Sequence, residues 1–189
     1  MRRPLWMFMM IALAQLAAPA WMMWRYERVR LHGTEHRFRT APIDPRDPFR
    51  GEHVVLEFEA ETGPFALPEG WSDGPLHAEL GADSAGFAVI VRLGTGAGEG
   101  DAVAVTVEDW SVNADDRTVG RVKLPFDRYY VREGQGPRTE ALLQPTWTDE
   151  ERVEPLPAHA VVRVRDGRAV VTDLVIGGRP LEAWMREPS

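Results

Sequence analysis

The feature that most constrains this chain is a long N-terminal stretch without charge. Residues 4–24 contain no Asp, Glu, Lys or Arg. As an α-helix, this stretch would be about 31 Å long, which matches the hydrocarbon core of a bilayer, about 30 Å thick. Trp21 and Trp24 lie at its C-terminal end, where membrane-spanning helices are enriched in tryptophan. We therefore predict a single transmembrane helix over residues 1–25 that is retained as an anchor.

A cleaved signal peptide is the alternative for the same stretch. Residues 2–3 would supply its basic start, residues 5–17 its apolar region, and Ala18-Pro19-Ala20 its cleavage motif. The apolar run continues past that motif through Trp21-Met22-Met23-Trp24. This continuation favours the retained anchor.

Arginines flank the apolar stretch on both sides, so the count of positive charge hardly favours one orientation in the membrane over the other. Arg2 and Arg3 precede it, and Arg25, Arg28 and Arg30 follow it, so the positive-inside rule does not separate the two orientations. The N-terminal flank is short and a folded domain follows the span, which favours export of that domain. We predict a single-pass protein of the cytoplasmic membrane whose soluble domain is extracytoplasmic.

Charge and cysteine content exclude several classes of function. The formal net charge is −7. Residues 1–30 contain five arginines and one glutamate, which gives +4, so the rest of the chain carries the difference, −11. An acidic soluble part disfavours nucleic acid as a partner, because phosphate backbones require basic surfaces. The chain has no cysteine, which excludes disulfides, thiolate catalysis and cysteine metal ligands. We expect no cofactor and no metal.

The segment after residue 41 is stiffened by proline and then turns. Pro42, Pro45 and Pro48 fix three φ angles in a short span, so a helix is excluded there and the chain is extended. Gly51 is the residue nearby that reaches positive φ without steric cost, and we predict that it closes the turn.

A strand follows this turn. From His53 the pattern alternates, as on a strand with one buried face. A shift of register by one residue would bury two carboxylates, so the register is strongly specified. We expect Val54, Leu56 and Phe58 on the buried face and Val55, Glu57 and Glu59 on the opposite face.

The remaining chain reads as short strands separated by turns, with one short helix. Asp166-Gly167 is its strongest hairpin signal, and Gly94–Gly100 is interpreted as a flexible hairpin connection. The predicted strands cover residues 85–93, 101–109, 118–124, 128–132, 159–165 and 168–176, and the predicted helix covers residues 138–144.

These patterns predict a mainly β fold, an antiparallel sandwich or open barrel with one short helix, following one transmembrane helix. The expected organisation is an anchor over residues 1–25, a juxtamembrane stalk over residues 26–41 and a β-rich domain over residues 42–189.

A cluster of charge occupies the proline-held loop before the first strand of the domain. It contains Asp44, Arg46, Asp47, Arg50 and Glu52. Two arginines among three carboxylates can form an ion-pair latch that fixes the entry of the strand, and this is our preferred interpretation. A binding surface on the same loop is the alternative.

The sequence contains no pattern that would carry catalysis by itself. No serine lies in a nucleophile elbow. The hypothesis from another class is a cell-envelope hydrolase that uses Asp47, Glu52, Glu57 or Glu133. It requires two of these carboxylates to converge about 5–9.5 Å apart. A third hypothesis, a small-ligand carrier, requires an apolar cavity in the barrel mouth.

Several of these segments resemble one known family. Gly51, Glu52, His53, Leu56 and Phe58 are similar to the motif Gly-Asp-Tyr-x-x-Leu-x-Tyr that gives the GDYXXLXY family its name. Glutamate for aspartate and phenylalanine for tyrosine are mild changes, whereas histidine for tyrosine is not. The segments 42–47, 130–134 with Glu140, and 166–168 with Leu174 and Gly178 also resemble that family, in matching order.

The resemblance implies a bacterial membrane-anchored protein of undefined activity. Its relatives are often encoded beside, or fused to, polytopic membrane proteins. We therefore predict a non-enzymatic domain that acts through protein contacts, with a polytopic membrane protein as partner. The residues expected to form its binding or structural motif are Asp44, Arg46, Asp47, Arg50, Gly51, Glu52, His53, Leu56, Phe58, Glu133 and Gly134.

Overall fold

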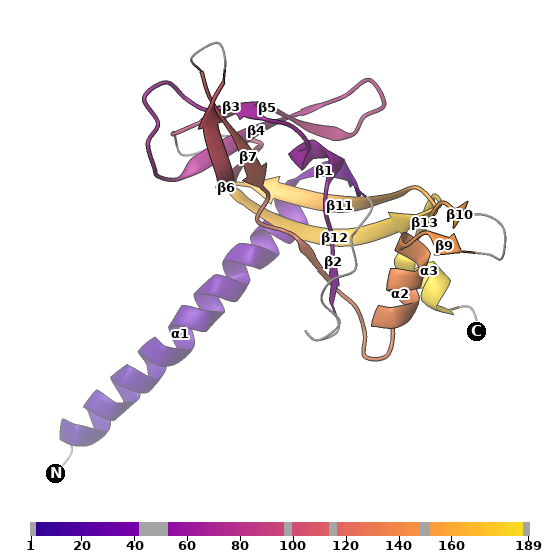
Figure 1. Cartoon of the computed structure of the whole chain (residues 1–189). Helices are drawn as coiled ribbons and strands as arrows, with labels where there is room; N and C mark the ends of the chain where they lie inside the picture. Colours follow the sequence, from indigo (N-terminus) through magenta and orange to yellow (C-terminus); the bar gives the residue numbers. More distant parts are fainter. Residues whose placement is uncertain (1–2, 42–52, 97–99, 114–116, 148–151, 187–189) are drawn as a thin grey trace.

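One long helix leaves a compact set of β-sheets in the computed structural model (Figure 1). The structure describes residues 3–41, 53–96, 100–113, 117–147 and 152–186. The long helix, α1 (Arg3–His32), contains the segment Trp6–His32, which is long and apolar enough to cross a membrane. The apolar part of that segment is not buried against the rest of the protein. The fold thus consists of one helix, whose apolar part stands free of the rest of the protein, and a β-rich domain.

All named strands pair in antiparallel fashion. Two small pairs join β2 (His53–Val55) to β8 (Arg128–Tyr130) and β9 (Thr146–Trp147) to β10 (Arg152–Val153). One sheet has four strands, in the order β1 (Thr34–Arg39), β11 (Ala158–Arg165), β12 (Arg168–Ile176) and β13 (Arg179–Pro180). The other has five, in the order β3 (Phe65–Ala66), β7 (Thr118–Lys123), β6 (Ala102–Val112), β4 (Leu76–Ala82) and β5 (Ala88–Gly94).

The tip of the β11–β12 hairpin joins the two large sheets. Asp166 and Gly167 have φ angles of 51° and 74°, the left-handed pair that a type I′ hairpin turn requires. Gly167 forms a bridge with Val103 on β6, and its carbonyl oxygen accepts a hydrogen bond from the Ala104 N–H at 3.4 Å. One of the sheets is nearly closed and barrel-like, and we call the paired sheets the barrel. The predicted mainly β fold, an antiparallel sandwich or open barrel, is confirmed.

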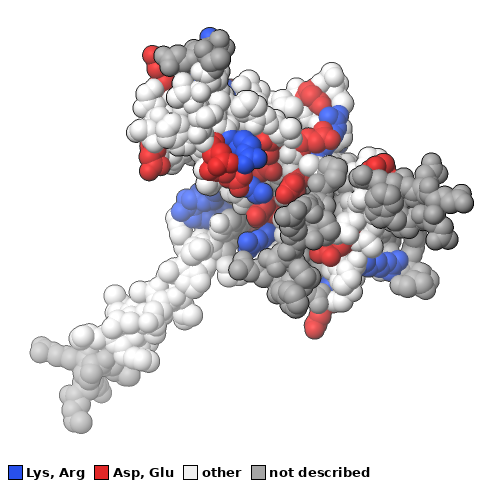
Figure 2. Space-filling model, in the orientation of Figure 1, with Lys and Arg blue, Asp and Glu red and all other residues white. Residues whose placement is uncertain are grey.

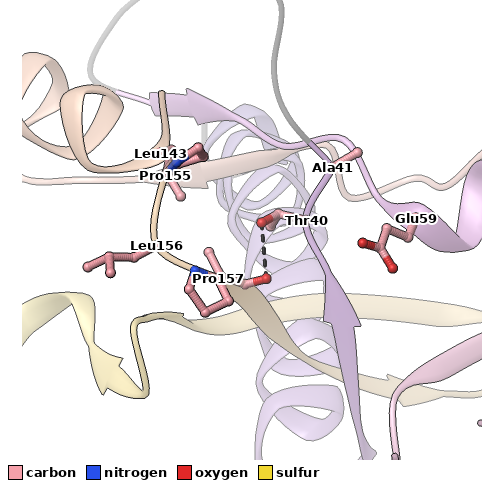
Figure 3. Close-up of a pocket in the computed structure, with 8 residues that line it drawn as sticks. Thr40, Ala41, Glu59, Leu143, Pro155, Leu156 and Pro157 are labelled. Atoms are coloured by element: carbon pink, nitrogen blue, oxygen red, sulfur yellow. Dashed lines mark hydrogen bonds between the residues drawn. The ribbon is translucent and has the colours of Figure 1, made fainter. Parts of the chain in front are cut away.

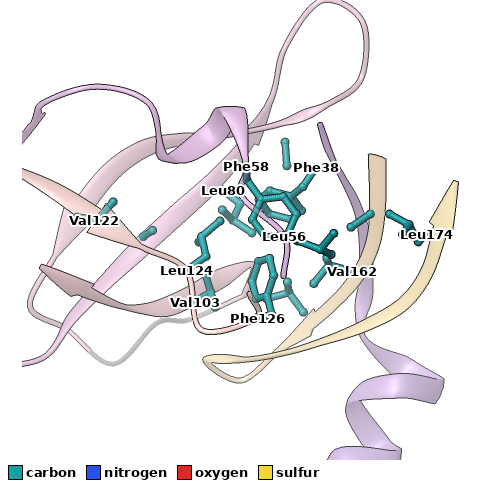
Figure 4. Packing of buried hydrophobic residues seen from close by; sticks show 14 of the residues in the cluster. Phe38, Leu56, Phe58, Leu80, Val103, Val122, Leu124, Phe126, Val162 and Leu174 are labelled. Carbon is teal, nitrogen blue, oxygen red and sulfur yellow. The ribbon is translucent and has the colours of Figure 1, made fainter. Parts of the chain in front are cut away.

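The core of the barrel contains the predicted buried face of the first strand. Val54, Leu56 and Phe58 are 1%, 0% and 2% exposed, whereas Val55 is 38% exposed. The expected alternation is therefore confirmed, although only His53–Val55 has regular strand pairing. The Phe58 ring packs against rings from other parts of the chain, as Figure 4 shows.

Two short helices complete the domain. The first, α2 (Gly136–Leu143), lies within one or two residues of the prediction for 138–144. The second, α3 (Leu181–Arg186), was not predicted, because six residues are too short to show helical periodicity. It is held by tertiary contacts: Leu181 is 3% exposed, and the Trp184 indole N–H donates to the Ile176 carbonyl at 3.0 Å.

Residues 26–41, expected as a stalk, are in contact with the domain. They contain the last turns of α1, where Val29 is 3% exposed, and all of β1, where Phe38 is fully buried. The β1 strand pairs with β11 along its whole length. The segment next to the anchor therefore contributes to the core of the barrel.

The interpretation of Gly94–Gly100 as a hairpin connection is wrong. The β4 strand pairs with both β5 and β6, so it lies between the two strands that this glycine-rich segment connects. Local sequence indicates a turn, but the choice of neighbouring strand depends on contacts across the whole sheet.

A half-buried carboxylate attaches the 3₁₀ turn η1 (Glu59–Glu61) to the end of β7. The two carboxylate oxygens of Glu61 accept hydrogen bonds from the Leu124 N–H at 2.7 Å and the Phe58 N–H at 3.1 Å. Burial raises the pKa of the Glu61 carboxyl, against the lowering effect of these two hydrogen bonds and of Lys123. The ionised form of this carboxyl is therefore partly desolvated in the folded domain.

Replacing Glu61 by glutamine tests this charge. Glutamine has one acceptor oxygen, so one buried N–H loses its partner, and we expect a loss of about 1–3 kcal/mol at neutral pH. The pKa of the Glu61 carboxyl is higher in the folded than in the unfolded state. The protonated carboxyl therefore stabilises the fold at pH values below the unfolded-state pKa. This stabilisation is lost as the pH rises through the folded-state pKa. The deficit of Glu61→Gln relative to the wild type should thus grow as pH falls from 7 to 4.

Urea unfolding of the full-length protein in detergent at both pH values measures this deficit. Glu69→Gln, which changes an exposed glutamate, is the matched control. A deficit that is equal at both pH values would contradict the raised pKa.

A candidate protein-contact surface

The β2–β8 pair brings together two segments that lie far apart in the sequence. In its register, His53 pairs with Tyr130, Val54 with Tyr129, and Val55 with Arg128. Directly opposed residues share a face, and faces alternate along each strand. Val54 is buried, so the other set points outward. We call this set the β2–β8 face: His53, Val55, Arg128 and Tyr130.

The β2–β8 face exposes an aromatic ring beside an aliphatic side chain. Tyr130 is 74% exposed, and its ring centroid lies 5.8 Å from that of His53. Val55 is 38% exposed on the same face. Exposed tyrosine with apolar neighbours is the composition that protein interfaces favour. This face can therefore bind a protein surface through stacking and apolar contact.

Backbone contacts hold the face in place from behind. The Leu56 N–H donates to the Asp127 carbonyl at 2.7 Å, which continues the β2–β8 pairing beyond its last strand residue. The α2 helix packs beside β2, and its Thr139 is fully buried, with the hydroxyl donating to the Gln135 carbonyl at 2.9 Å. The core of the barrel therefore supports the β2–β8 face from behind.

Five of the eleven expected motif residues lie in the described part of the chain. Leu56 and Phe58 are core residues, and His53 is on the β2–β8 face. Glu133 and Gly134 form the turn between β8 and α2, where Gly134 has a φ of 81°. The other six lie outside the described residues, and the ion-pair latch therefore stays a prediction: Asp44, Arg46, Asp47, Arg50, Gly51 and Glu52.

The carboxylates of the hydrolase hypothesis are described only in part. Asp47 and Glu52 lie outside the described residues, and Glu57 and Glu133 are both exposed. Glu57 is near enough to Glu61 for its charge to contribute to the raised pKa there. Both Glu61 oxygens already accept backbone hydrogen bonds. Among the described residues, no group of three or more His, Asp or Glu side chains could hold a metal ion.

A small pocket lies between the end of β1 and the end of α2 (Figure 3). Its volume is about 160 Å³, below the 300–1,000 Å³ typical of small-molecule sites. Its polar groups include the Glu59 carboxylate and the Thr40 hydroxyl, which donates to the Ala158 carbonyl at 3.1 Å. The lining residues are Thr40, Ala41, Glu59, Leu143, Pro155, Leu156, Pro157 and Ala158.

Sequence reasoning did not single out Val55, Arg128 and Tyr130 as members of one face. Alternation placed Val55 opposite the core, but it gave no reason to single out the residue. Tyr130 was noted only within a family-like segment. The pairing of β8 with β2 brings these residues onto one face. No local signal in the sequence shows which strand pairs with which.

Comparison with known proteins assigns the chain to a protein family. No curated protein and no solved structure matches the chain. A family model described as GDYXXLXY protein matches residues 15–174, from the middle of α1 to the second half of β12. This match covers most of the chain, including the β2–β8 pair. The chain belongs to the GDYXXLXY protein family.

Proposed function

We propose that this protein is a membrane-tethered, non-enzymatic domain that binds a polytopic membrane protein through its β2–β8 face. The observation that carries the proposal is the exposed Tyr130 ring beside His53 and Val55, on a strand pair supported by the core. Large aromatic anchors of this kind contribute most of the binding energy of many interfaces.

The long apolar helix and the family both fit a membrane-anchored protein. The helix continues without interruption to His32, and Val29 near its end is buried against the domain. A tether this short keeps the domain near the lipid surface. It therefore raises the effective concentration of any partner in the same membrane.

Site-specific photocrosslinking tests the proposed partner. A benzoylphenylalanine at position 130 of the full-length protein should yield an adduct with a polytopic membrane protein in native membranes. The same probe at position 91, where Val91 is 65% exposed on β5, is the matched control and should yield none. Adducts at both positions, at neither, or only with soluble proteins at position 130 would contradict the proposal.

Substitutions on the face should weaken capture of that partner. Removing an interface anchor costs about 2 kcal/mol or more, which corresponds to a loss of at least about tenfold in affinity. We expect this loss for Tyr130→Ser, whereas Val91→Ser should retain the affinity of the wild type. Because both side chains are exposed, the far-ultraviolet circular dichroism of both variants should be unchanged.

The compartment of the domain is open to a direct test. We propose that the domain lies outside the cytoplasm. Alkaline phosphatase fused to the C-terminus should then be active, and a fluorescent protein at the same position should stay dark. The opposite pair of results would place the domain in the cytoplasm and restrict its partner to the cytoplasmic face.

A further inference from the structure

A polar groove opens where α1 meets the outer face of β11 and β12. Its volume is about 490 Å³, and we call it the junction groove. Leu31 and Val161 supply its apolar lining. Its polar lining is two arginines, two carboxylates and one hydroxyl: Arg30, Arg163, Glu35, Asp173 and Thr172.

A β-bulge places two polar side chains in this groove. Val161 pairs with Asp173 and Val162 pairs with Val171, so Thr172 is an extra residue on β12. Bulges redirect side chains in this way and are over-represented next to functional sites. Here Thr172 and the neighbouring Asp173 both line the groove, whereas regular alternation would place them on opposite faces.

The arginines are held near the end of α1. Arg163 donates to the Gly33 carbonyl at 3.3 Å and to the Glu35 carboxylate at 3.0 Å. Arg30 forms an ion pair with Glu27 at 2.6 Å, with 56% of its side chain exposed. Each guanidinium group has five N–H donors, so both keep donors beyond those used in these bonds.

Asp173 differs from the other acidic residue of the groove. Glu35 is paired with Arg163, but Asp173 forms no ion pair with any described residue. Its carboxylate accepts the N–H of Leu174 at 2.8 Å. Burial and the charge of Arg37 lower the pKa of the nearby His159 imidazole, against the raising effect of the Asp173 charge. The groove thus holds a carboxylate that has no ion-pair partner among the described residues, and two guanidinium groups line the same groove.

With α1 inserted in a bilayer, the junction groove would lie at the height of the lipid headgroups. Charge begins at Arg25 after the uncharged stretch, and Arg30 is five residues further, about 7.5 Å along the helix axis. The headgroup layer on each side of a bilayer is about 5–8 Å thick. Figure 2 shows Lys and Arg side chains where the helix enters the domain. The long arginine side chains there can reach down to phosphates.

We propose that the junction groove binds the headgroup of phosphatidylethanolamine. The lipid phosphate pairs with Arg30 and Arg163, and its primary ammonium donates to the Asp173 carboxylate. The glycerol end of the lipid packs against Leu31 and Val161. This inference rests on the proposed insertion of α1 in the membrane, and it adds a lipid that fixes the angle between the anchor and the barrel.

Native mass spectrometry of the full-length protein ejected from nanodiscs tests this site. The discs contain equal parts of phosphatidylcholine and phosphatidylethanolamine, which share the phosphate but differ in amine N–H donors. An exposed ion pair contributes up to about 1 kcal/mol, so we expect about two- to fivefold enrichment of retained phosphatidylethanolamine.

Matched variants separate the ammonium contact from the fold. Asp173→Asn keeps the oxygen that accepts the Leu174 N–H but removes the charge, and it should abolish the enrichment. Asp173→Glu should retain it. Glu79→Gln, which changes an exposed carboxylate paired with Arg92 on β4 and β5, should leave it unchanged. Arg163→Gln should lower the retention of both lipids.

Three outcomes would overturn the proposal. Equal retention of the two lipids would show that the lipid ammonium does not contact Asp173. An unchanged enrichment in Asp173→Asn would place the selectivity elsewhere. In discs with phosphatidylglycerol as a third component, preference for that lipid would indicate a purely basic site. Flotation of the protein with vesicles is measured in parallel, because failure to float would refute the tether itself, whereas flotation without enrichment refutes only the headgroup site.

Discussion

Replacing Phe58 by alanine should lower the free energy of unfolding of the domain by about 3–5 kcal/mol. Phe58 is 2% exposed, and its ring centroid lies 5.5 Å from that of Phe38 and 5.4 Å from that of Phe126. Phe38 and Phe126 also contact each other, at 5.1 Å. The three rings come from different segments and meet at one point of the core, so the cavity cannot be closed by one segment moving alone.

This loss is a large part of the stability of a domain, which is about 5–15 kcal/mol. Urea unfolding of the full-length protein in detergent, followed by tryptophan fluorescence, measures it. Glu57→Ala is the matched control, since it changes the preceding residue on the exposed side and should stay within about 0.5 kcal/mol of the wild type. If Phe58→Ala were as stable as that control, the aromatic cluster would not be the core of this domain.

Replacing Gly33 by valine should destabilise the junction between α1 and the barrel by about 3 kcal/mol, the upper end of the usual range for overpacking. A Cβ atom at this position would lie 2.6 Å from the Val29 carbonyl oxygen, 3.0 Å from the Val164 carbonyl oxygen and 3.1 Å from the Arg163 Cβ. Two of these are backbone atoms, so relief requires the helix and the β11 strand to separate.

That separation should be visible at the junction itself. The Gly33 and His32 carbonyls, which accept from Arg163 and Arg165 at 3.3 Å, would lose those bonds, and limited proteolysis should cut between α1 and β1 in the variant only. Gly94→Ala is the matched control, because a Cβ there would have no neighbour within 4 Å. Equal resistance of both variants to protease would show that the close approach at Gly33 is not needed.

Local sequence was enough to predict the kinds of element in this chain. The uncharged run predicted a helix of membrane-spanning length, and alternation predicted that Val54, Leu56 and Phe58 would be buried together. Asp166-Gly167 predicted a hairpin, which has the expected pair of positive φ angles. Each of these signals depends on neighbours within a few residues, because side-chain periodicity and turn geometry are local properties of the backbone.

The candidate site could be predicted only in part. His53, Glu133 and Gly134 were expected as motif residues, and the structure places His53 on the β2–β8 face and the other two in the turn that follows β8. The partner of His53 across the strands, Tyr130, was not singled out as a site residue. Its importance depends on exposure and on pairing with β2, and neither is encoded in its own neighbourhood.

By itself, the sequence determined that this protein has a lipid-compatible helix and an acidic antiparallel β domain. Tertiary structure alone decided that β1 belongs to the barrel, that β4 lies between β5 and β6, and that the tip of the β11–β12 hairpin contacts β6. It also decided that a bulge on β12 would face the end of α1. The physical reason is that strand pairing is a choice among distant segments, which depends on the total burial and hydrogen bonding of the barrel and not on the residues of any one strand.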